Sequence, residues 1–216
     1  MKDIFAVYKP KGPTSNKILQ EIKRSSGAKK VGHAGTLDPL ASGVLVVAIG
    51  REATKKLGEI VGKEKEYLAT VRLGTISETD DSEGEKTKID VKTIPRKKDI
   101  ESFLPEFSGE IWQTPPIYSA IKIKGKEAYK LARKGKPVKL NPRKVIIKKI
   151  EILSYCWPYL RLRVITGPGV YIRALARDLG SRLKTGGYLA ALERVRVGDF
   201  TKEKALTVED FSKLPS

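Results

Sequence analysis

Hydrophobic residues follow two different periods along this chain, and Gly and Pro separate the segments in which each period holds. Residues 66–74 alternate in polarity, so Tyr67, Ala69 and Val71 share one face of a predicted strand. Three other segments are rich in β-branched and aliphatic residues and are also predicted as strands: 3–10, 144–153 and 159–166. The chain therefore supplies several strands, and no long linker divides it.

Apolar residues recur at helical spacing in segments between these strands. Residues 14–27 are predicted as a helix, because Ile18 and Ile22 share one face and Thr14 or Ser15 can cap the N-terminus. Further helices are predicted at 99–107, 127–135 and 167–183. Strands mixed with short helices, without an internal repeat, indicate an α+β fold with a mixed, largely antiparallel sheet flanked by helices.

The stretch GHAGTLDPLASGVL, residues 32–45, surrounds one acid with turn-forming residues. Gly35 can adopt backbone angles that other residues avoid, and Pro39 keeps Asp38 out of the helical region. The next run, residues 44–49, is apolar and β-branched, as in a strand covered on both faces. Asp38 is therefore expected on a shaped loop before a buried strand. Either it is a turn aspartate that bonds its own backbone, or its carboxylate is held there for chemistry.

The charge balance narrows the kind of partner. The 216 residues include 43 Lys and Arg against 25 Asp and Glu, a net charge of +18, which favours a polyanionic partner, nucleic acid before membrane. No apolar run approaches the ~20 residues that span a bilayer, and the N-terminus lacks the pattern of a secretory signal. One cysteine, Cys156, allows no internal disulfide and favours the reducing cytoplasm. We expect a cytoplasmic monomer that binds no membrane.

The basic residues concentrate in one part of the chain. Between Lys122 and Lys149 there are twelve Lys or Arg and a single acid, Glu127, with Tyr118 and Tyr129 beside or within the stretch. Such a segment can be a solvated face. Its charge density and its Gly and Pro residues favour instead a projection that grips phosphates.

The composition also excludes several kinds of active site. With one Cys and one His, the usual zinc sites built from these residues cannot form, and no GxSxG motif accompanies the single histidine, His33. The chain has neither a GxxxxGK[ST] phosphate loop nor a GxGxxG dinucleotide motif. An enzyme with this sequence is expected to work without a metal or a bound cofactor.

Six segments together resemble the TruB-type tRNA pseudouridine synthases, which isomerise the T-loop uridine at tRNA position 55. In chain order they are YKPKGPTSN, GHAGTLDPLASGVL, KEYLATVRLG, TPPIYSAIKIKGKEAYKLARKG, GVYIRALARDLG and LAALERVRVGDF. They keep the family's order and cover nearly the whole chain, and the continuation PLASG resembles bacterial members. The resemblance implies a pseudouridine synthase fold with a basic, thumb-like insertion, residues 110–145, inside one catalytic domain, residues 1–216.

The same resemblance implies roles for individual residues. Asp38 would be the nucleophile, Arg173 the cation that keeps it ionised, and Tyr67 the ring that stacks on the uracil. His33 would fill the space of the flipped-out uridine or brace the loop. The other matched substrate-binding positions are Tyr171, Leu192 and Lys9, with Asp81 in a supporting role. The RNA-binding residues are expected to be Lys122, Lys124, Lys126, Lys130, Arg133, Lys134 and Lys136.

Two departures from the family pattern and three functional interpretations follow. Val170 stands where many relatives have Thr, next to Tyr171. We expect the C-terminal PUA-type domain of many bacterial members to be absent, since the sequence stops at residue 216.

Besides an enzyme, a tRNA-binding folding chaperone on the same scaffold or a ribosome-associated structural protein would fit the charge. Only an enzyme needs a carboxylate aimed at a base. Attack by Asp38 on the uracil ring or on the ribose C1′ stays open.

Overall fold

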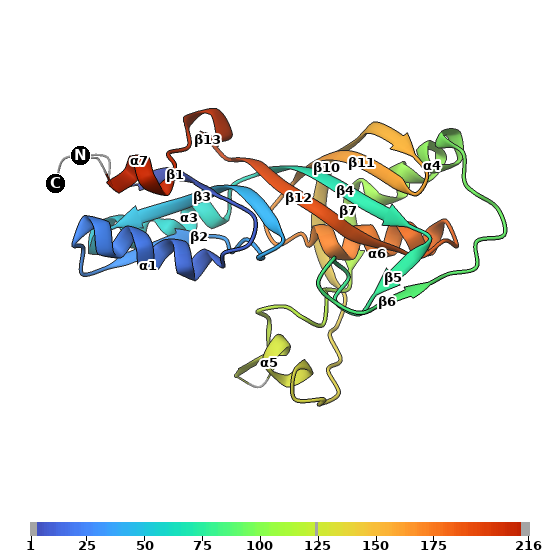
Figure 1. The fold of residues 1–216 in the computed structure, drawn as a ribbon, viewed down its shortest axis with the longest axis horizontal. Coiled ribbons are helices and arrows are strands. Elements are labelled where there is room, and N and C mark those ends of the chain that lie inside the picture. Colours follow the sequence, from blue (N-terminus) through green and yellow to red (C-terminus); the bar gives the residue numbers. More distant parts are fainter. Residues whose placement is uncertain (1–3, 124, 213–216) are drawn as a thin grey trace. The chain divides into compact units, whose positions relative to one another are not determined.

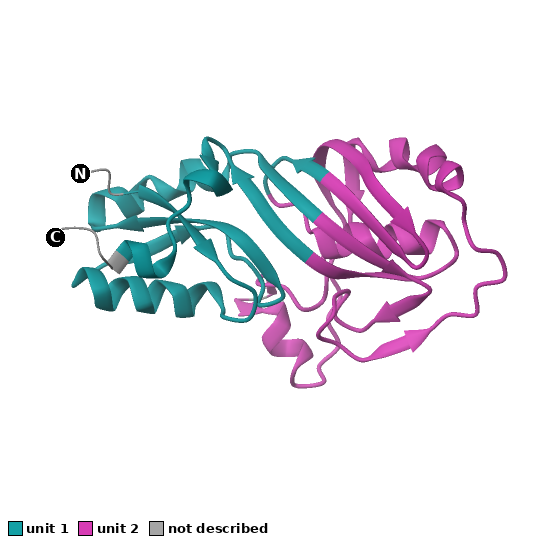
Figure 2. Ribbon diagram, turned by 45° about the horizontal axis from the view of Figure 1, so that its top comes forward, with its two compact units in different colours: residues 1–68, 164–168, 192–216 teal, residues 69–163, 169–191 magenta. Residues whose placement is uncertain are grey.

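The computed structural model describes residues 4–123 and 125–212, and the chain divides into two compact units, coloured separately in Figure 2. Unit 1 comprises residues 1–68, 164–168 and 192–216, and unit 2 comprises residues 69–163 and 169–191. The units alternate along the sequence because three strands run from one into the other. That the whole chain acts as one catalytic domain stays a prediction.

Figure 1 labels the helices and strands. Those that begin in unit 1 are β1 (Ile4–Lys9), α1 (Ser15–Ser26), β2 (Val31–Ala34), β3 (Ala41–Ile49), α2 (Arg51–Lys55), α3 (Leu57–Val61), β4 (Lys65–Leu73), β13 (Phe200–Thr201), the 3-10 helix η2 (Lys202–Lys204) and α7 (Val208–Ser212). Those that begin in unit 2 are β5 (Thr75–Ser77), β6 (Lys86–Lys88), α4 (Lys97–Phe103), the 3-10 helix η1 (Leu104–Phe107), β7 (Gly109–Gln113), β8 (Lys122–Ile123), β9 (Lys126–Glu127), α5 (Ala128–Ala132), β10 (Arg143–Cys156), β11 (Tyr159–Thr166), α6 (Ile172–Arg182) and β12 (Gly187–Val197).

The main sheet has the strand order β1-β3-β12-β4-β11-β10-β7, with β2 paired to β3 and β13 paired to β12. Strand β12 runs parallel to β3, and Leu192 lies opposite Ala41. The pairs β1–β3, β2–β3, β7–β10 and β12–β13 are antiparallel. The sheet is therefore mixed and largely antiparallel, and with its helices it confirms the predicted α+β fold class.

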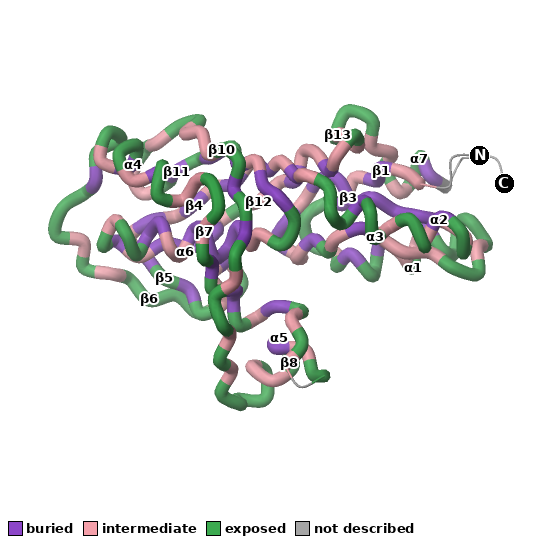
Figure 3. The backbone as a smooth tube through the Cα atoms, turned by 180° about the vertical axis from the view of Figure 1, so that it is seen from behind, coloured by how far each residue is buried: buried purple, intermediate pink, exposed green. Residues whose placement is uncertain are grey.

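Strand β3 is buried along most of its length (Figure 3). Its side chains belong to two core clusters, one on each face. On one face Leu45 and Val47 belong to a cluster completed by residues of β1, α1 and α7. On the other face Val44 and Val46 belong to a cluster completed by β1, β2, α3 and β12. Burying one such side chain stabilises a fold by about 1.5–3 kcal/mol. The prediction that residues 44–49 form a strand covered on both faces is confirmed, so the loop before β3 leads into a rigid element.

Helix α1 settles which residue caps its N-terminus. The Thr14 side chain accepts a hydrogen bond from the N–H of Lys17 at 3.1 Å, which makes Thr14 the N-cap. The helix ends before Gly27, whose φ of +64° is the left-handed conformation that glycine favours. Ser15 is buried instead of capping, and its hydroxyl is used elsewhere in unit 1.

Several short strands are not predicted by the sequence, and one of them, β2, borders the loop that carries Asp38. Strand β2 pairs antiparallel with the second half of β3, so that His33 lies opposite Val47 and Ala34 opposite Val46. Two glycines within five residues hide this strand from a propensity argument, because glycine is depleted in strands. The loop that carries Asp38 is therefore shorter than the sequence indicates and covers residues 35–40.

In unit 2, helix α6 turns back tightly into β12. The N–H groups of Thr185 and Gly186 both donate to the carbonyl of Gly180, each at 3.0 Å. A Cβ on Gly180 would lie 2.3 Å from the carbonyl carbon of Gly186, so only glycine allows this approach. The apolar residues of α6 are buried, as its predicted spacing requires: Ile172, Leu175, Ala176 and Leu179.

The predicted insertion is a hairpin, β8 and β9, followed by α5, and Figure 1 shows it standing apart from the strands of unit 2. It covers residues 114–142, because β7 and β10 close it with Gln113 opposite Arg143. Helix α5 is shorter than predicted. Residues 133–135 form a turn that ends at Gly135, with φ of +66°.

Candidate active site

Asp38 lies in the loop between β2 and β3, and contacts of its neighbours fix its backbone. The N–H of Leu37 donates to Oγ of Ser15, and this hydroxyl donates to the carbonyl of Leu37, both at 2.9 Å. The N–H of Ala41 donates to the carbonyl of Asp38 at 3.0 Å and closes the turn. The half-buried Asp38 is thus held against the first turn of α1 at one side and the start of β3 at the other.

Lys9 supports this loop from the end of β1. Its fully buried ammonium group donates to the carbonyls of Pro10 and Pro13 at 2.9 and 2.8 Å. The turn so formed presents the N–H of Gly12, which donates to the carbonyl of Pro39 at 2.8 Å. Lys9 therefore stabilises the turn that holds the residue after the candidate nucleophile. Its predicted role in substrate binding stays a prediction.

Arg194 of β12 is a supporting residue that sequence reasoning missed. Only 1% of it is exposed, and its guanidinium donates to the carbonyls of Val44 and Gly35 at 2.8 and 3.0 Å. It thus joins the loop to β3. The sequence signal for this close approach is a pair of glycines, Gly35 and Gly43. A Cβ on Gly35 would lie 3.4 Å from Nη1 of Arg194, and one on Gly43 would lie 2.2 Å from its carbonyl oxygen.

Two titratable groups in unit 1, His33 and Lys65, have pKa values lowered by burial and by the charge of Arg194. Burial, and next the charge of Arg194, lower the pKa of His33 below its usual 6.5, so the imidazole is neutral at pH 7. Among the described residues, Nδ1 of His33 is buried and has no hydrogen-bond partner. The same two causes lower the pKa of Lys65 to about 8. This part of unit 1 is dehydrated and positively charged.

Tyr67 and Leu192 complete the predicted residues of unit 1. Tyr67 is 7% exposed and lies on the face of β4 that also buries Ala69 and Val71, as its alternation predicts. Leu192 is half-buried and pairs with Ala41, at the end of the loop that carries Asp38. Their contact with uracil stays a prediction.

Arg173 lies in the first turn of α6 in unit 2 and is 6% exposed. Its Nη1 donates to Oδ2 of Asp81 at 3.3 Å and to the carbonyl of Thr79 at 3.2 Å, and its Nη2 donates to the carbonyl of Tyr118 at 2.9 Å. Asp81 in turn accepts from the hydroxyl of Thr79 and from the N–H of Glu83. Asp81 and the two carbonyls therefore hold the guanidinium within unit 2, and a supporting role of Asp81 in the reaction stays a prediction.

A second arginine ties the same loop to α6 one turn later. Arg177 donates to Asp80 and to the carbonyl of Thr114, each at 2.8 Å. Burial raises the pKa of Asp80, although the charge of Arg177 opposes this. Asp80 adopts φ of +59°, an uncommon conformation for a non-glycine residue. Residues 79–83 and the segment after β7 are thus both anchored to α6.

Asp38 and Arg173 lie in different units. The contacts described above fix each of them within its own unit. That Arg173 is the ionising partner of Asp38 stays a prediction.

The basic segment is exposed where it was predicted to bind RNA. The exposed residues are Lys122, Lys126, Lys130, Arg133, Lys134 and Lys136, and Lys124 lies outside the described residues. Tyr129 lies among them, with the guanidinium carbon of Arg133 5.6 Å from its ring centroid. Lys130 pairs with Glu127 at 3.1 Å. Charge next to an aromatic ring suits a nucleic-acid surface, and RNA binding here stays a prediction.

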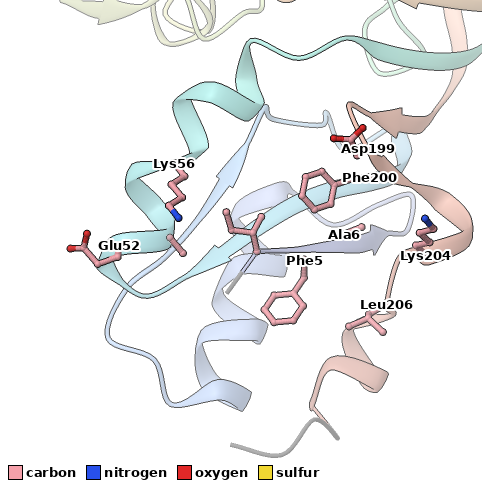
Figure 4. A pocket seen from close by; sticks show the side chains of 10 residues that line it. Phe5, Ala6, Glu52, Lys56, Asp199, Phe200, Lys204 and Leu206 are labelled. Carbon is pink, nitrogen blue, oxygen red and sulfur yellow. The ribbon is translucent and has the colours of Figure 1, made fainter. Parts of the chain in front are cut away.

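A separate pocket of about 750 Å³ lies in unit 1 beside β1 and α2 (Figure 4). Phe5 and Phe200 line it together with charged residues such as Lys56 and Lys204. None of the predicted catalytic or substrate-binding residues lines this pocket. It is therefore not part of the candidate active site.

In the part of the chain that the structure describes, no helix is long and apolar enough to cross a membrane.

Solved structures define the class to which this fold belongs. A chain from a crystal structure of a Cbf5–Nop10–Gar1 complex is 31% identical, with a TM-score of 0.74 over 97% of this chain and 53% of that chain. A structure described as a pseudouridylate synthase shares the fold at 18% identity, with a TM-score of 0.50 over 97% of this chain and 73% of that chain. The chain therefore has the pseudouridine synthase fold.

The family follows from sequence comparison. Residues 23–172 match the TruB family pseudouridylate synthase N-terminal domain, and residues 173–215 match the tRNA pseudouridylate synthase B C-terminal domain. The tRNA pseudouridine synthase B of Clostridium tetani is 41% identical over 99% of this chain and 73% of its own length. That of Clostridium novyi is 44% identical over 95% and 71%. The chain belongs to the TruB family, and it is a tRNA pseudouridine synthase, an intramolecular isomerase.

Proposed function

We propose that the protein converts uridine 55 in the T-loop of tRNA to pseudouridine, with Asp38 as the nucleophile. The observation that carries this proposal is the loop at residues 35–40. Ser15, the turn at residues 10–13 and Arg194 hold its main chain from separate elements. A carboxylate that must meet one carbon atom needs such support, because a displacement of about 1 Å can cost ~100-fold in rate.

The chemistry asks for a carboxylate that can add and then leave. Asp38 adds to the uridine and the glycosidic bond to N1 breaks. The uracil re-attaches through C5, Asp38 leaves again, and the proton on C5 is lost while N1 gains a proton. Atoms balance without a redox partner or a co-substrate. The target must leave its stack first, and His33 is proposed to take its place or to brace the loop. Tyr67, Tyr171 and Leu192 are proposed to contact the uracil, and Arg173 to keep Asp38 ionised.

The basic insertion is proposed to hold the T-arm of the tRNA. Its exposed Lys and Arg residues would contact phosphates, which supply affinity and not sequence choice. A tRNA-folding chaperone would need this surface as well, but it would not need Asp38. The two functions are therefore separable by one substitution.

The direct test incubates the protein with unmodified tRNA in the presence of a metal chelator and maps pseudouridine at each nucleotide. We expect product at position 55 alone. Asp38→Asn should keep the fold and the tRNA affinity but lose turnover. Asp199→Asn, an exposed aspartate of unit 1, is the matched control and should behave as the wild type. Residual turnover of Asp38→Asn within about tenfold of the wild type, only ~1.4 kcal/mol of barrier, would exclude Asp38 as the nucleophile.

A further inference from the structure

Gln113, at the end of β7, uses its whole side-chain amide on one residue. Its Nε2 donates to the carbonyl of Tyr171 at 3.1 Å, and its Oε1 accepts from the N–H of Tyr171 at 2.8 Å. Gln113 is 1% exposed. Burying an amide is costly unless its hydrogen bonds are made, so an apolar residue would fill this space at lower cost if packing were the only need. The amide specifies where the main chain of Tyr171 lies.

Arg143, the register partner of Gln113 on β10, holds the side chain of the same residue. Its guanidinium carbon lies 5.1 Å from the ring centroid of Tyr171, and its Nη2 donates to the carbonyl of Gly169. A guanidinium over an aromatic ring is attracted by about 0.5–2 kcal/mol. One paired position of the β7–β10 ladder therefore grips both the main chain and the ring of Tyr171.

Tyr171 is also where α6 begins. It is the N-cap of the helix and offers no side-chain cap, while its carbonyl accepts the helical bond from Leu175 at 3.1 Å. The amide of Gln113 shares that carbonyl. Arg173 follows two residues later in the first turn. A shift of Tyr171 would therefore tilt the turn that carries the guanidinium.

We propose that Gln113 and Arg143 are positioning residues that set the ring of Tyr171 and the first turn of α6 for the isomerisation. This inference rests on the proposed function, which gives Tyr171 and Arg173 their roles. The same pair closes the basic insertion at residues 114–142, so the base of the RNA-binding segment and the start of α6 share one support. The contact pattern predicts an effect on the chemical step and not on tRNA affinity.

The first measurement does not depend on activity. The eight tyrosines are replaced by 3-fluorotyrosine, and the ¹⁹F resonance of Tyr171 is assigned with Tyr171→Phe. Gln113→Met and Arg143→Gln should each shift or broaden this resonance. The controls are Gln20→Met, the other glutamine and an exposed one, and Lys144→Gln, the next residue of β10, which removes the same charge. Neither control should move it.

The second measurement separates binding from chemistry. With tRNA bound to saturation, the single-turnover rate of Gln113→Met should fall about 10- to 100-fold, as expected for a reacting group displaced by about 1 Å. The Kd for tRNA should stay within about threefold, since phosphate contacts dominate affinity. In a Tyr171→Ala background, Arg143→Gln should cost less than about threefold more, because the ring that Arg143 contacts is already gone.

The outcomes are distinct. A Tyr171 resonance that stays in place would overturn the positioning role. So would a rate reduction of Arg143→Gln that adds fully to that of Tyr171→Ala. If Gln113→Met fails to fold, Arg143→Gln at its half-buried position carries the same test. If the wild type forms no pseudouridine in tRNA, the proposed function fails. The fluorine signal then still decides whether the pair positions Tyr171.

Discussion

Replacement of Asp81 by Asn tests whether the buried ion pair of unit 2 prepares Arg173 for catalysis. The side chains of Arg173 and Asp81 are 7% and 3% exposed, and their closest atoms lie 3.3 Å apart. An asparagine has the same size. It can still accept from Thr79 and from the N–H of Glu83 with its amide oxygen. Its NH₂ group, however, would face the donor Nη1 of Arg173.

The magnitude follows from the hydrogen bonds that change. One hydrogen bond between charged groups, worth about 1.5–3 kcal/mol, is removed, while the bonds from Arg173 to the carbonyls of Thr79 and Tyr118 remain. We expect the free energy of unfolding to fall by about 2 kcal/mol. A guanidinium that loses this anchor should move by a fraction of an ångström to about 1 Å, so the single-turnover rate should fall about 10- to 100-fold.

The assay compares Asp81→Asn with Asp80→Asn. Both substitutions remove a carboxylate from the same loop, and both break a pair with an arginine of α6, but Asp80 pairs with Arg177. We expect unfolding by denaturant to show a similar loss of stability for the two variants, and tRNA affinity to change little in either. Only Asp81→Asn should slow the chemical step. Equal reductions of rate in both variants would mean that docking of the loop on α6, and not the position of Arg173, controls the reaction.

Three further predictions concern other parts of the molecule. Gly43→Ala should lower the free energy of unfolding by more than about 4 kcal/mol in denaturant, because the new Cβ would lie 2.2 Å from the carbonyl oxygen of Arg194. The control Gly27→Ala, whose Cβ would meet open space, should cost about 1 kcal/mol. The pKa of Lys65 is about 8 in the folded state and 10.5 in the unfolded state, so the unfolded state binds more protons between these pH values. The free energy of unfolding of the wild type should therefore rise with pH in this range relative to that of Lys65→Met. Parallel stability–pH curves of the two proteins would contradict the lowered pKa. Replacing four exposed basic residues of the insertion by Gln should reduce the slope of log K for tRNA binding against log salt concentration. The reduction should be roughly 0.7–0.9 for each phosphate that the protein no longer neutralises. Replacing a matched set of exposed basic residues near the end of α1 should leave this slope unchanged. The two sets are Lys126, Arg133, Lys134 and Lys136, and Lys23, Arg24, Lys29 and Lys30.

The sequence predicted those parts of the fold in which local signals agree. The helix at residues 14–27 has a cap, an apolar face and a glycine stop, and all three are observed. The alternation in residues 66–74 is reproduced as alternating burial in β4. Strand β2 was missed because only its pairing with β3 makes residues 31–34 a strand.

The candidate site divides in the same way. A motif identifies Asp38 and Arg173, but no local pattern shows that the hydroxyl of Ser15 reaches Leu37 across 22 residues. The hydrogen bond from Arg194 to Gly35 spans 159 positions and could not be predicted either. Such contacts depend on which strands become neighbours. The parallel pairing of β12 with β3 is the step that brings Arg194 to the loop.

The buried cations of unit 1 create a positive potential beside the loop at residues 35–40. The hydrogen bonds described for Arg194 and Lys65 all go to main-chain carbonyls. Carbonyls satisfy the donors but do not cancel the charge, so a positive potential persists in a region from which water is largely removed. Burial first, and the charge of Arg194 second, lower the pKa values of His33 and Lys65, so both groups are disfavoured as cations there. The same potential favours an anion. Asp38, the proposed nucleophile, belongs to the loop whose main chain Arg194 holds at the carbonyl of Gly35.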